Sequence, residues 1–253
     1  MLLPSLDNSI INPIPIHIKE KYLLLDIGGT IVHITEPFDV YTKRAIGYVY
    51  DALNPNVARE TFIRSLYQER IDIRKQAERT LIEYSFREFI KRGLQRFNIE
   101  ISNESANQLE LMYIKAELET TELFADTVPF LQKTKNNSKI ICAATNNFSV
   151  SHVYELLKKF NIGSYFSAVH ISGEIRIRKP DKKFLDTIRS HQNIPMNRND
   201  CVLIGDKLLI DILSGKRSGV KTCFLDRNGY TAVKPIKNVS PDFVISSLSE
   251  IEF

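Results

Sequence analysis

Residues 201–225 read CVLIGDKLLIDILSGKRSGVKTCFL, and this stretch decides the fold class. The apolar runs Cys201–Ile204 and Thr222–Leu225 predict two short strands. Between them, Leu209–Arg217 has the pattern of a helix, and Gly219 is a typical residue to end it. A strand, a helix and a second strand in this order form a right-handed crossover, so we expect the two strands to lie parallel in one sheet.

The same alternation of strands and helices continues on both sides of this stretch. Further strands are expected at Tyr22–Leu25, Lys139–Ala144, Ala168–Ile171 and Asp242–Ile245, and further helices near Pro129–Lys135, Ser151–Phe160 and Asp181–Ser190. The run YLLL in the first of these strands is typical of a strand that helices cover on both faces. The sequence therefore predicts an α/β fold, a doubly wound parallel sheet of the Rossmann-like kind.

A different periodicity interrupts this alternation from about residue 41 to residue 122. Apolar residues recur there at helical spacing, Asn103 is a plausible helix N-cap, and the segment has no convincing strand pattern. A polar turn around Thr35 leads into it. We therefore expect an N-terminal arm at 1–20, an α/β core formed by 21–36 and 125–253, and an inserted helical cap at 37–124.

Composition excludes several classes of protein. The 34 Lys and Arg residues exceed the 30 Asp and Glu residues by only 34 − 30 = 4, a charge too small to predict a nucleic-acid partner. The three cysteines lie in apolar runs without a CxxC pair, which favours reduced, buried thiols. No apolar run is long enough for a membrane span, and the N-terminus lacks the pattern of a signal peptide. We expect a cytoplasmic protein without a membrane partner, and the sequence leaves its oligomeric state open.

Polar side chains follow several of the expected strands. They are Asp26, Thr145 with Asn146, Lys179, and Asp206 with Asp211. Each has an ordinary structural interpretation when taken alone, as a turn residue, a helix cap or a solvated side chain. Ligands of open α/β sheets bind at the carboxyl ends of the strands, so these residues are expected to meet in one crevice. A carboxylate nucleophile, a hydroxyl, an ammonium and metal-binding carboxylates together suit phosphoryl transfer through an aspartyl intermediate.

Four motifs in this order resemble the haloacid dehalogenase superfamily over nearly all residues from Tyr22 to Ile251. The motifs are Asp26–Thr30 (DIGGT), Thr145–Asn146, Lys179–Pro180, and Gly205–Asp206 with Asp211. The helical insert also lies where that superfamily places a cap of the first type. The resemblance implies a Mg²⁺-dependent hydrolase, a phosphatase that acts on a small phosphorylated metabolite through an aspartyl-phosphate.

The resemblance also implies roles for individual residues. Asp26 would be the nucleophile, and Thr145 and Lys179 would hold the phosphoryl group. The Mg²⁺ ligands would come from Asp26, the Gly28 carbonyl, Asp206 and Asp211, and substrate contacts from Gly29, Thr30 and Asn146. An all-oxygen ligand set of this kind suits Mg²⁺.

One position departs from the pattern of the phosphatases in this superfamily. They carry a second Asp two residues after the nucleophile, as general acid and base, where this chain has Gly28. Three outcomes stay open: a weak phosphatase or one with an acid from the cap, an enzyme of different chemistry, and a catalytically silent binding protein. A further alternative is a sugar-kinase-like ATP-binding protein, in which DIGGT is the phosphate loop.

The insert contains many Arg and Lys residues that alternate with Glu, which favours a solvated surface with i,i+4 ion pairs. A subset that faces the crevice could bind an anionic substrate. Tyr41, Tyr48 and Tyr50 are candidates for lining its mouth, although its helical spacing favours a core position for Tyr50.

Overall fold

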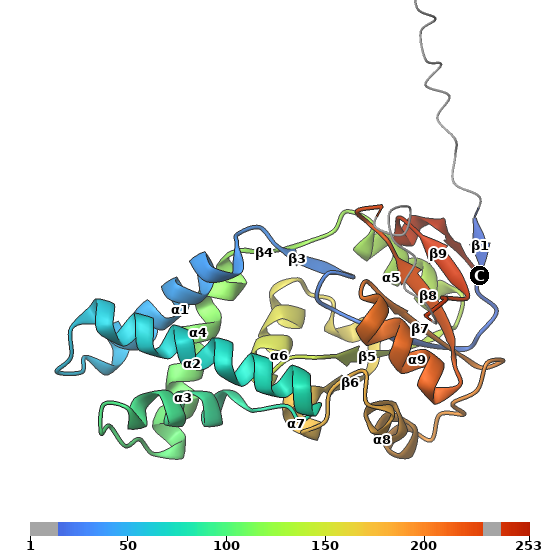
Figure 1. Cartoon of the computed structure of the whole chain (residues 1–253). Helices are drawn as coiled ribbons and strands as arrows, with labels where there is room; N and C mark the ends of the chain where they lie inside the picture. The colour runs from blue at the N-terminus through green and yellow to red at the C-terminus, as the bar shows by residue number, and fades with distance from the viewer. Residues whose placement is uncertain (1–14, 230–238) are drawn as a thin grey trace, which may run out of the picture.

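The computed structural model describes residues 15–229 and 239–253, so residues 1–14 of the expected N-terminal arm lie outside the described part. A parallel sheet of six strands forms the centre of the molecule, with the strand order β6-β5-β2-β7-β8-β9 (Figure 1). The strands are β2 (Tyr22–Leu25), β5 (Ile140–Thr145), β6 (Phe166–Ile171), β7 (Cys201–Gly205), β8 (Lys221–Leu225) and β9 (Phe243–Ile245). This sheet confirms the α/β fold class that the sequence predicts.

Helices cover both faces of the sheet. Alternation along β2 sends Leu23 and Leu25 to one face and Leu24 to the other, and all three side chains are fully buried. The first face packs against α5 (Thr127–Asn136) and α6 (Val150–Lys159), and the second against α8 (Lys182–Gln192). Because both faces are covered, β2 has a continuous apolar sequence rather than an alternating one.

The strand order reverses at β2. The chain passes from β2 to β5 and β6 on one side, then returns through α8 to β7, β8 and β9 on the other side. The carboxyl ends of β5, β2 and β7 are therefore neighbours at the topological switch point of the sheet, which is where α/β proteins bind ligands.

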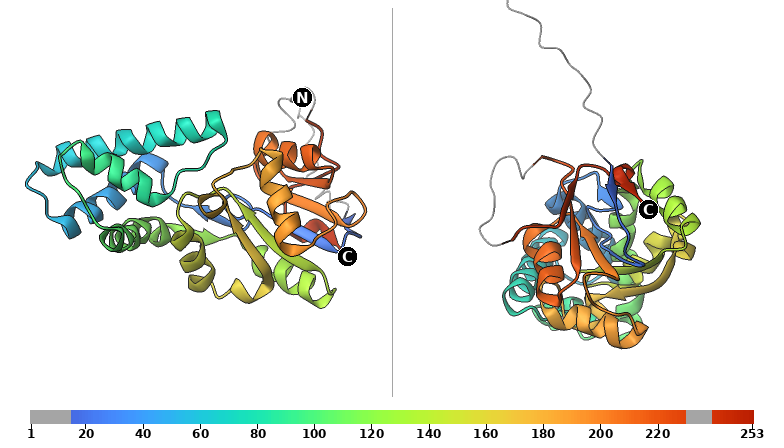
Figure 2. Two further views of the ribbon diagram at one scale, coloured as in Figure 1. Left: turned by 90° about the horizontal axis from the view of Figure 1, so that it is seen from below. Right: turned by 90° about the vertical axis from the view of Figure 1, so that its right-hand side faces the viewer.

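Four helices form a second body beside the sheet (Figures 1 and 2). They are α1 (Phe38–Leu53), α2 (Arg59–Thr80), α3 (Phe86–Gln95) and α4 (Asn103–Glu119). They enclose an apolar cluster of their own, which includes the buried rings of Phe62, Phe89 and Tyr113. The C-terminus lies at the opposite end of the molecule from these helices (Figure 2). The boundaries of the cap at 37 and 124 stay a prediction.

Several short elements differ from the sequence expectations. The strands β3 (Val32–Ile34) and β4 (Thr121–Leu123) pair antiparallel where the chain enters and leaves the four helices. The expectation of no strand from about residue 41 to residue 122 was wrong at β4, and β3 was not predicted, because strands this short depend on a partner rather than on their own pattern. Ser102, not Asn103, caps α4, since its side chain accepts a hydrogen bond from the Ser105 N–H.

Other short elements complete the described chain. They are β1 (Ile16–His17), which pairs with β10 (Ile251–Glu252), η1 (Gly163–Tyr165), α7 (Ser172–Ile175), the π-helical turn η2 (Leu208–Ile212), α9 (Leu213–Ser218) and η4 (Leu248–Glu250). The helix expected from residue 209 to 217 is thus divided into η2 and α9. The three cysteines are buried and unbonded, as expected. No helix within the described ranges is long and apolar enough to cross a membrane.

The four-helix body is tied to the core by backbone and side-chain contacts. Ile82 and Ile177 form an antiparallel bridge, which joins the turn after α2 to the loop before α8. The buried Glu83 next to it accepts a hydrogen bond from Ser172 at 2.7 Å and pairs with Arg178 at 3.4 Å. Phe148, from the loop after β5, packs into the apolar cluster of the four helices. These contacts hold the helical body against the carboxyl ends of the strands.

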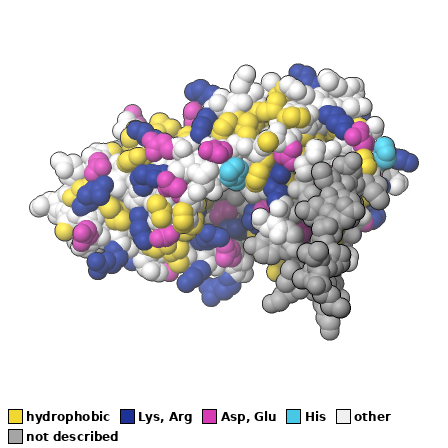
Figure 3. Space-filling model, turned by 90° about the horizontal axis from the view of Figure 1, so that it is seen from above, with side chains coloured by type: hydrophobic (Ala, Val, Ile, Leu, Met, Phe, Trp, Pro, Cys, Tyr) yellow, Lys and Arg dark blue, Asp and Glu magenta, His cyan; other side chains and the backbone are white. Residues whose placement is uncertain are grey.

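Charged side chains of both signs are mixed over the surface of the helical body, at the left of Figure 3. Arg74 pairs with Glu78 and Lys43 with Asp39, each at i,i+4 spacing. This surface agrees with the expected solvated face, and such exposed pairs contribute little to stability.

Candidate active site

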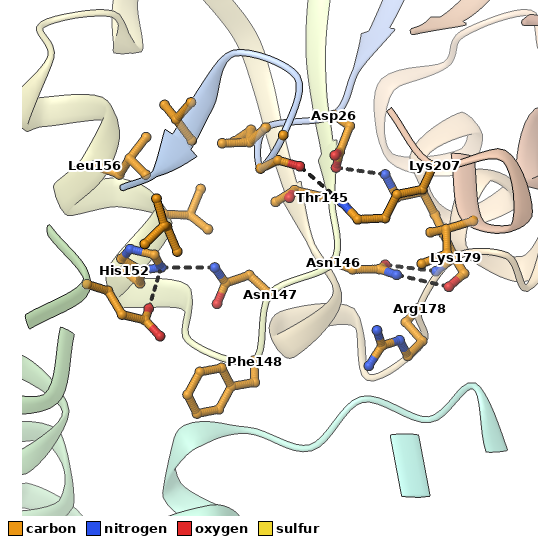
Figure 4. A pocket seen from close by; sticks show the side chains of 18 of the residues that line it. Asp26, Thr145, Asn146, Asn147, Phe148, His152, Leu156, Arg178, Lys179 and Lys207 are labelled. Atoms are coloured by element: carbon orange, nitrogen blue, oxygen red, sulfur yellow. Dashed lines mark hydrogen bonds and ion pairs between the residues drawn. The ribbon is translucent and has the colours of Figure 1, made fainter. Parts of the chain in front are cut away.

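Three neighbouring strands bring the expected site residues together (Figure 4). Asp26 follows β2, Thr145 is the last residue of β5, and Asp206 follows β7. Lys179 lies in the loop before α8 and Asp211 in the turn η2, and both reach the same place. The candidate site is therefore a product of the sheet topology.

Lys179 is the centre of a buried charge cluster. Only 1% of its side chain is exposed. Its Nζ lies 2.9 Å from Asp26 Oδ1 and 2.6 Å from Asp211 Oδ1, and it also donates to the Ala144 carbonyl. The ammonium has three N–H donors, so these partners use its whole capacity. Lys179 is therefore not a solvated surface side chain, which was its ordinary structural interpretation.

Asn146 fixes the backbone that carries this lysine. Its Oδ1 accepts a hydrogen bond from the Lys179 N–H and its Nδ2 donates to the Lys179 carbonyl, both at 2.9 Å. In this structure the Asn146 side chain therefore positions Lys179. A direct contact of Asn146 with substrate stays a prediction.

The charges of this cluster keep Asp26 ionised. Burial raises the pKa of Asp26, but the positive charges of Lys179 and Lys207 outweigh burial and hold the pKa below its ordinary value. Burial likewise acts to lower the pKa of Lys179, but Asp211 and Asp26 outweigh it and raise that pKa. Asp26 is thus a carboxylate at neutral pH, which is the form that a nucleophile needs.

An acidic centre lies beside this ion cluster. Carboxylate oxygens of Asp26, Asp206 and Asp211 lie within 4.8 Å of one another. The Gly28 carbonyl faces the same point, because the Nζ of Lys207 contacts both this carbonyl and Asp206. Mg²⁺ prefers such hard oxygen donors and takes only one or two carboxylates from a protein. The residues present therefore fit a Mg²⁺ ion held by Asp26, Asp206 and the Gly28 carbonyl. Both oxygens of Asp211 accept hydrogen bonds, from Lys179 and from the Lys207 N–H, and its role as a metal ligand stays a prediction.

Glycine has a different importance at each of the two positions that follow Ile27. A Cβ added to Gly29 would lie 2.2 Å from Asp206 Oδ2, and Gly29 has a φ of +87°, so a side chain there is excluded. A Cβ added to Gly28 would meet nothing within 4 Å, and its φ is not positive. Gly28 therefore leaves room for a side chain at the position where the resemblance implies an Asp in phosphatases.

The two threonines have different environments. Thr145 lines the cavity beside Asp26, and its hydroxyl makes no hydrogen bond to another residue that the structure describes. It is thus available to a phosphoryl oxygen. Thr30 is fully buried, and its hydroxyl lies 3.5 Å from Asp206 Oδ1. Contact of Thr30 or Gly29 with substrate stays a prediction.

The cavity in front of Asp26 has a volume of about 490 Å³ and extends to the four-helix body. Phe38, Tyr41, Arg70 and Arg74 line it on that side. Tyr48 and Tyr50 do not: Tyr48 bonds to Glu119 and Tyr50 donates to the Val57 carbonyl. Of the three tyrosines suggested by the sequence, only Tyr41 is at the cavity.

The sequence did not indicate Arg70 and Lys207 individually. The Arg70 guanidinium lies 4.0 Å from the ring centre of Phe148, and its buried Nε has no hydrogen-bond partner among the described residues. Arg70 was one of many basic residues in the insert, and no local pattern separated it from the others. Lys207 lies between Asp206 and Asp211 of the fourth motif, and this position is the sequence feature that could have indicated it.

Comparison with known proteins decides the family. The profile of the haloacid dehalogenase-like hydrolases matches residues 53–225. The chain belongs to this family. The match begins after Asp26 and Gly28, so it does not include the first motif. It does not favour the sugar-kinase interpretation of DIGGT.

Relatives in this family include enzymes that act on phosphate esters. Pyrimidine 5'-nucleotidase YjjG of Escherichia coli (strain K12) is 30% identical over 62% of this chain and 65% of its own length. The glyceraldehyde 3-phosphate phosphatase of Methanopyrus kandleri is 28% identical over 51% of this chain and 54% of its own. The matches thus span less than two thirds of either relative.

A solved structure supports the fold. The magnesium-bound structure of YfnB from Bacillus subtilis has a TM-score of 0.59, with 19% identity over 91% of this chain and 96% of that one. The similarity extends over both the sheet and the helical body. At this level of identity it establishes the fold alone.

Asp206→Asn is expected to stabilise the metal-free protein and to abolish its response to Mg²⁺. Burial and the charge of Asp26 raise the pKa of Asp206 to about 6. Because the folded-state pKa is above the unfolded one, this group favours folding at low pH and loses that contribution as pH rises through about 6. At pH 8 the amide should add about 1–3 kcal/mol to the free energy of unfolding.

Urea unfolding with EDTA or Mg²⁺ measures both effects. Asp242→Asn is the matched control, because its neighbours, chiefly Arg198 and Lys216 against the opposing effect of burial, hold the pKa of Asp242 well below its usual range. That variant should be destabilised and should still be stabilised by Mg²⁺. An equal Mg²⁺ response in Asp206→Asn and the wild type would remove Asp206 from the metal site.

Proposed function

We propose that this protein is a Mg²⁺-dependent phosphatase of a small phosphorylated metabolite and that it acts through an aspartyl-phosphate on Asp26. The observation that carries the proposal is the ionised Asp26, held by the buried Lys179 beside an acidic centre and a Thr145 hydroxyl that makes no hydrogen bond to another described residue. The nucleotide and sugar phosphate named in its relatives support a small phosphorylated substrate.

In the first step of the proposed reaction the Asp26 carboxylate attacks phosphorus, and the bond to the leaving oxygen breaks. In the second step water attacks the same phosphorus, the bond to Asp26 breaks, and inorganic phosphate leaves. Thr145 donates a hydrogen bond to a phosphoryl oxygen. Lys179 keeps Asp26 ionised and oriented, and its contact with the phosphoryl group requires that one of its three present bonds is exchanged. Asp26, Asp206 and the Gly28 carbonyl would hold a Mg²⁺ ion, which would neutralise part of the phosphate charge.

Gly28 limits the substrates that we propose. It offers no group to protonate the leaving oxygen or to activate water for the second step. Substrates whose leaving group needs little protonation, such as acyl phosphates, should therefore react faster than ordinary monoesters. The catalytically silent alternative predicts no turnover of either kind.

On the side of the helical body, we propose that Arg70 receives the part of the substrate away from the phosphate. No carboxylate of the described residues lies within ion-pair distance of its guanidinium, whereas Arg74 pairs with Glu78 and Arg178 with Glu83. A guanidinium on a cavity wall that has no carboxylate partner among the described residues favours a negatively charged or polar group. A cytoplasmic location stays a prediction.

A panel of phosphate monoesters and acyl phosphates, assayed for released phosphate with Mg²⁺ and with EDTA, tests the proposed function. We expect release that depends on Mg²⁺ and is fastest for acyl phosphates. Inertness toward the whole panel at saturating Mg²⁺ would favour the silent alternative.

Gly28→Asp is expected to raise turnover of an ordinary monoester about 10²–10⁴-fold, because it supplies the missing general acid and base. The open space around Gly28 allows the side chain without a backbone clash. Gly28→Asn is the matched control, since it has the same size and cannot exchange a proton in this way. Equal rates for the two variants would show that the missing acid does not limit catalysis.

A further inference from the structure

Lys207 lies on the oxygen atoms that the proposed Mg²⁺ would use. Its Nζ is 3.2 Å from the Gly28 carbonyl oxygen and 3.1 and 3.2 Å from the two carboxylate oxygens of Asp206. Figure 4 shows Lys207 beside Asp26 at the end of the central strands. One cationic group thus already occupies part of this acidic centre.

The backbone does not force the Lys207 ammonium into this position. The side chain of Lys207 is 49% exposed, so solvent is open to it, whereas Lys179 is buried. The backbone of Lys207 is held separately, since its N–H donates to Asp211 Oδ2 at 3.0 Å. The ammonium can therefore leave the acidic centre by rotation of its side chain, without a change in the backbone.

The charges of the centre explain why the ammonium lies there. Asp26, Asp206 and Asp211 bring three carboxyl groups together, and Lys179 forms ion pairs with only Asp26 and Asp211. These carboxyl groups attract the ammonium of Lys207.

A Mg²⁺ ion that bound Asp206 and the Gly28 carbonyl would lie within a few ångströms of the Lys207 ammonium. Two cations at such a distance repel each other strongly, even at the effective dielectric constant of a protein surface.

We propose that Lys207 is a built-in competitor of Mg²⁺: its ammonium neutralises the metal-free centre and must move out before the ion binds. The inference rests on the metal site of the proposed function and adds a determinant of its affinity. The apparent affinity for Mg²⁺ is then set by an exchange of cations, so the site should fill only at higher Mg²⁺ concentrations than it would without Lys207.

Calorimetric titration of the whole protein with Mg²⁺ tests this inference. Lys207→Met keeps the length of the side chain and removes its charge, and it should bind Mg²⁺ at least about tenfold more tightly than the wild type. Lys207→Arg keeps the charge and should gain no affinity. Lys158→Met is the matched control, because Lys158 pairs with Glu155 on α6, outside the site, and should leave the affinity unchanged.

A second measurement uses the wild type and does not depend on the folding of any variant. Acetylation of lysines by a water-soluble ester, read by mass spectrometry, should label Lys207 faster when Mg²⁺ is present, while Lys158 should be labelled at an unchanged rate. Labelling of Lys207 that Mg²⁺ leaves unchanged or slows would overturn the inference.

The outcomes distinguish a failure of this inference from a failure of the proposed function on which it rests. Equal or weaker Mg²⁺ affinity in Lys207→Met than in the wild type overturns the competition and leaves the metal site intact. Binding in Lys207→Met alone supports the inference in its strongest form. No binding by any variant at millimolar Mg²⁺ overturns both the competition and the metal part of the proposed function.

Discussion

Asp26→Asn is expected to lower the turnover number at least about 10⁴-fold, an effect of the size seen when a nucleophile is removed from other enzymes. The amide has nearly the shape of the carboxylate, but it cannot form the aspartyl-phosphate. Lys179 keeps Asp211 as a partner in the variant, so the fold should persist. Phosphate release under single- and multiple-turnover conditions measures the loss.

Two comparisons make this result specific. Asp242→Asn removes a carboxylate that binds Lys216 and Thr222 away from the site, and it should retain turnover. If the wild type is too slow to follow, the same pair of variants is compared in the Gly28→Asp background. Activity that survives in Asp26→Asn with an unchanged circular dichroism spectrum would contradict the assignment of the nucleophile.

Lys179→Met is expected to have the largest effect on stability, about 3–5 kcal/mol in the free energy of unfolding, because it leaves buried carboxylates without their counter-charge. Lys179 and Asp211 are each only 1% exposed, so water cannot replace the lost partner. The variant should also lose activity, since Asp26 would no longer be held ionised. Urea unfolding followed by circular dichroism measures the change.

The double variant Lys179→Met with Asp211→Asn separates the two roles of the lysine. It removes one of the two buried negative charges, so it should recover part of the lost stability. Turnover should not recover, because Asp26 still lacks the ammonium that bonds to it and orients it. A Lys179→Met protein as stable as the wild type would show that the charge cluster does not hold the core together.

The sequence predicts the sheet well because its strands are buried on both faces. The runs at β2, β5 and β7 are continuously apolar, and helix-forming segments separate them, so both strand positions and parallel pairing follow from pattern alone. The pair β3 and β4 escaped prediction, since three-residue strands have no period long enough to read. Their existence depends on a contact between residues that are far apart in the chain.

The candidate site was predictable where a residue ends a strand. Asp26, Thr145 and Asp206 meet because their strands are neighbours, which the fold class implies. The roles of Asn146 and Lys207 were not predictable, because each depends on the direction of one side chain toward a distant backbone carbonyl or N–H. Local sequence carries no information about such a contact.

The packing of the helical body against the core was also beyond the sequence. Glu83 is a charged residue in a segment rich in Glu and Arg, and nothing in the local pattern shows that it is buried against Ser172. Phe148 follows a strand of the core and yet packs among the rings of the helical body. Both positions result from contact between the helical body and the core.

Labelling with ³²P-acetyl phosphate tests the central claim most directly, since it looks for the aspartyl-phosphate itself. The wild type is incubated with the label in Mg²⁺ or EDTA, quenched in acid and digested for peptide mapping. We expect Mg²⁺-dependent, hydroxylamine-labile label on the peptide that contains Asp26, and none in Asp26→Asn. Because Gly28 cannot activate water, the label should last longer than in Gly28→Asp. Label on another residue, or none in either Asp26-containing protein at saturating Mg²⁺, would contradict the proposed mechanism.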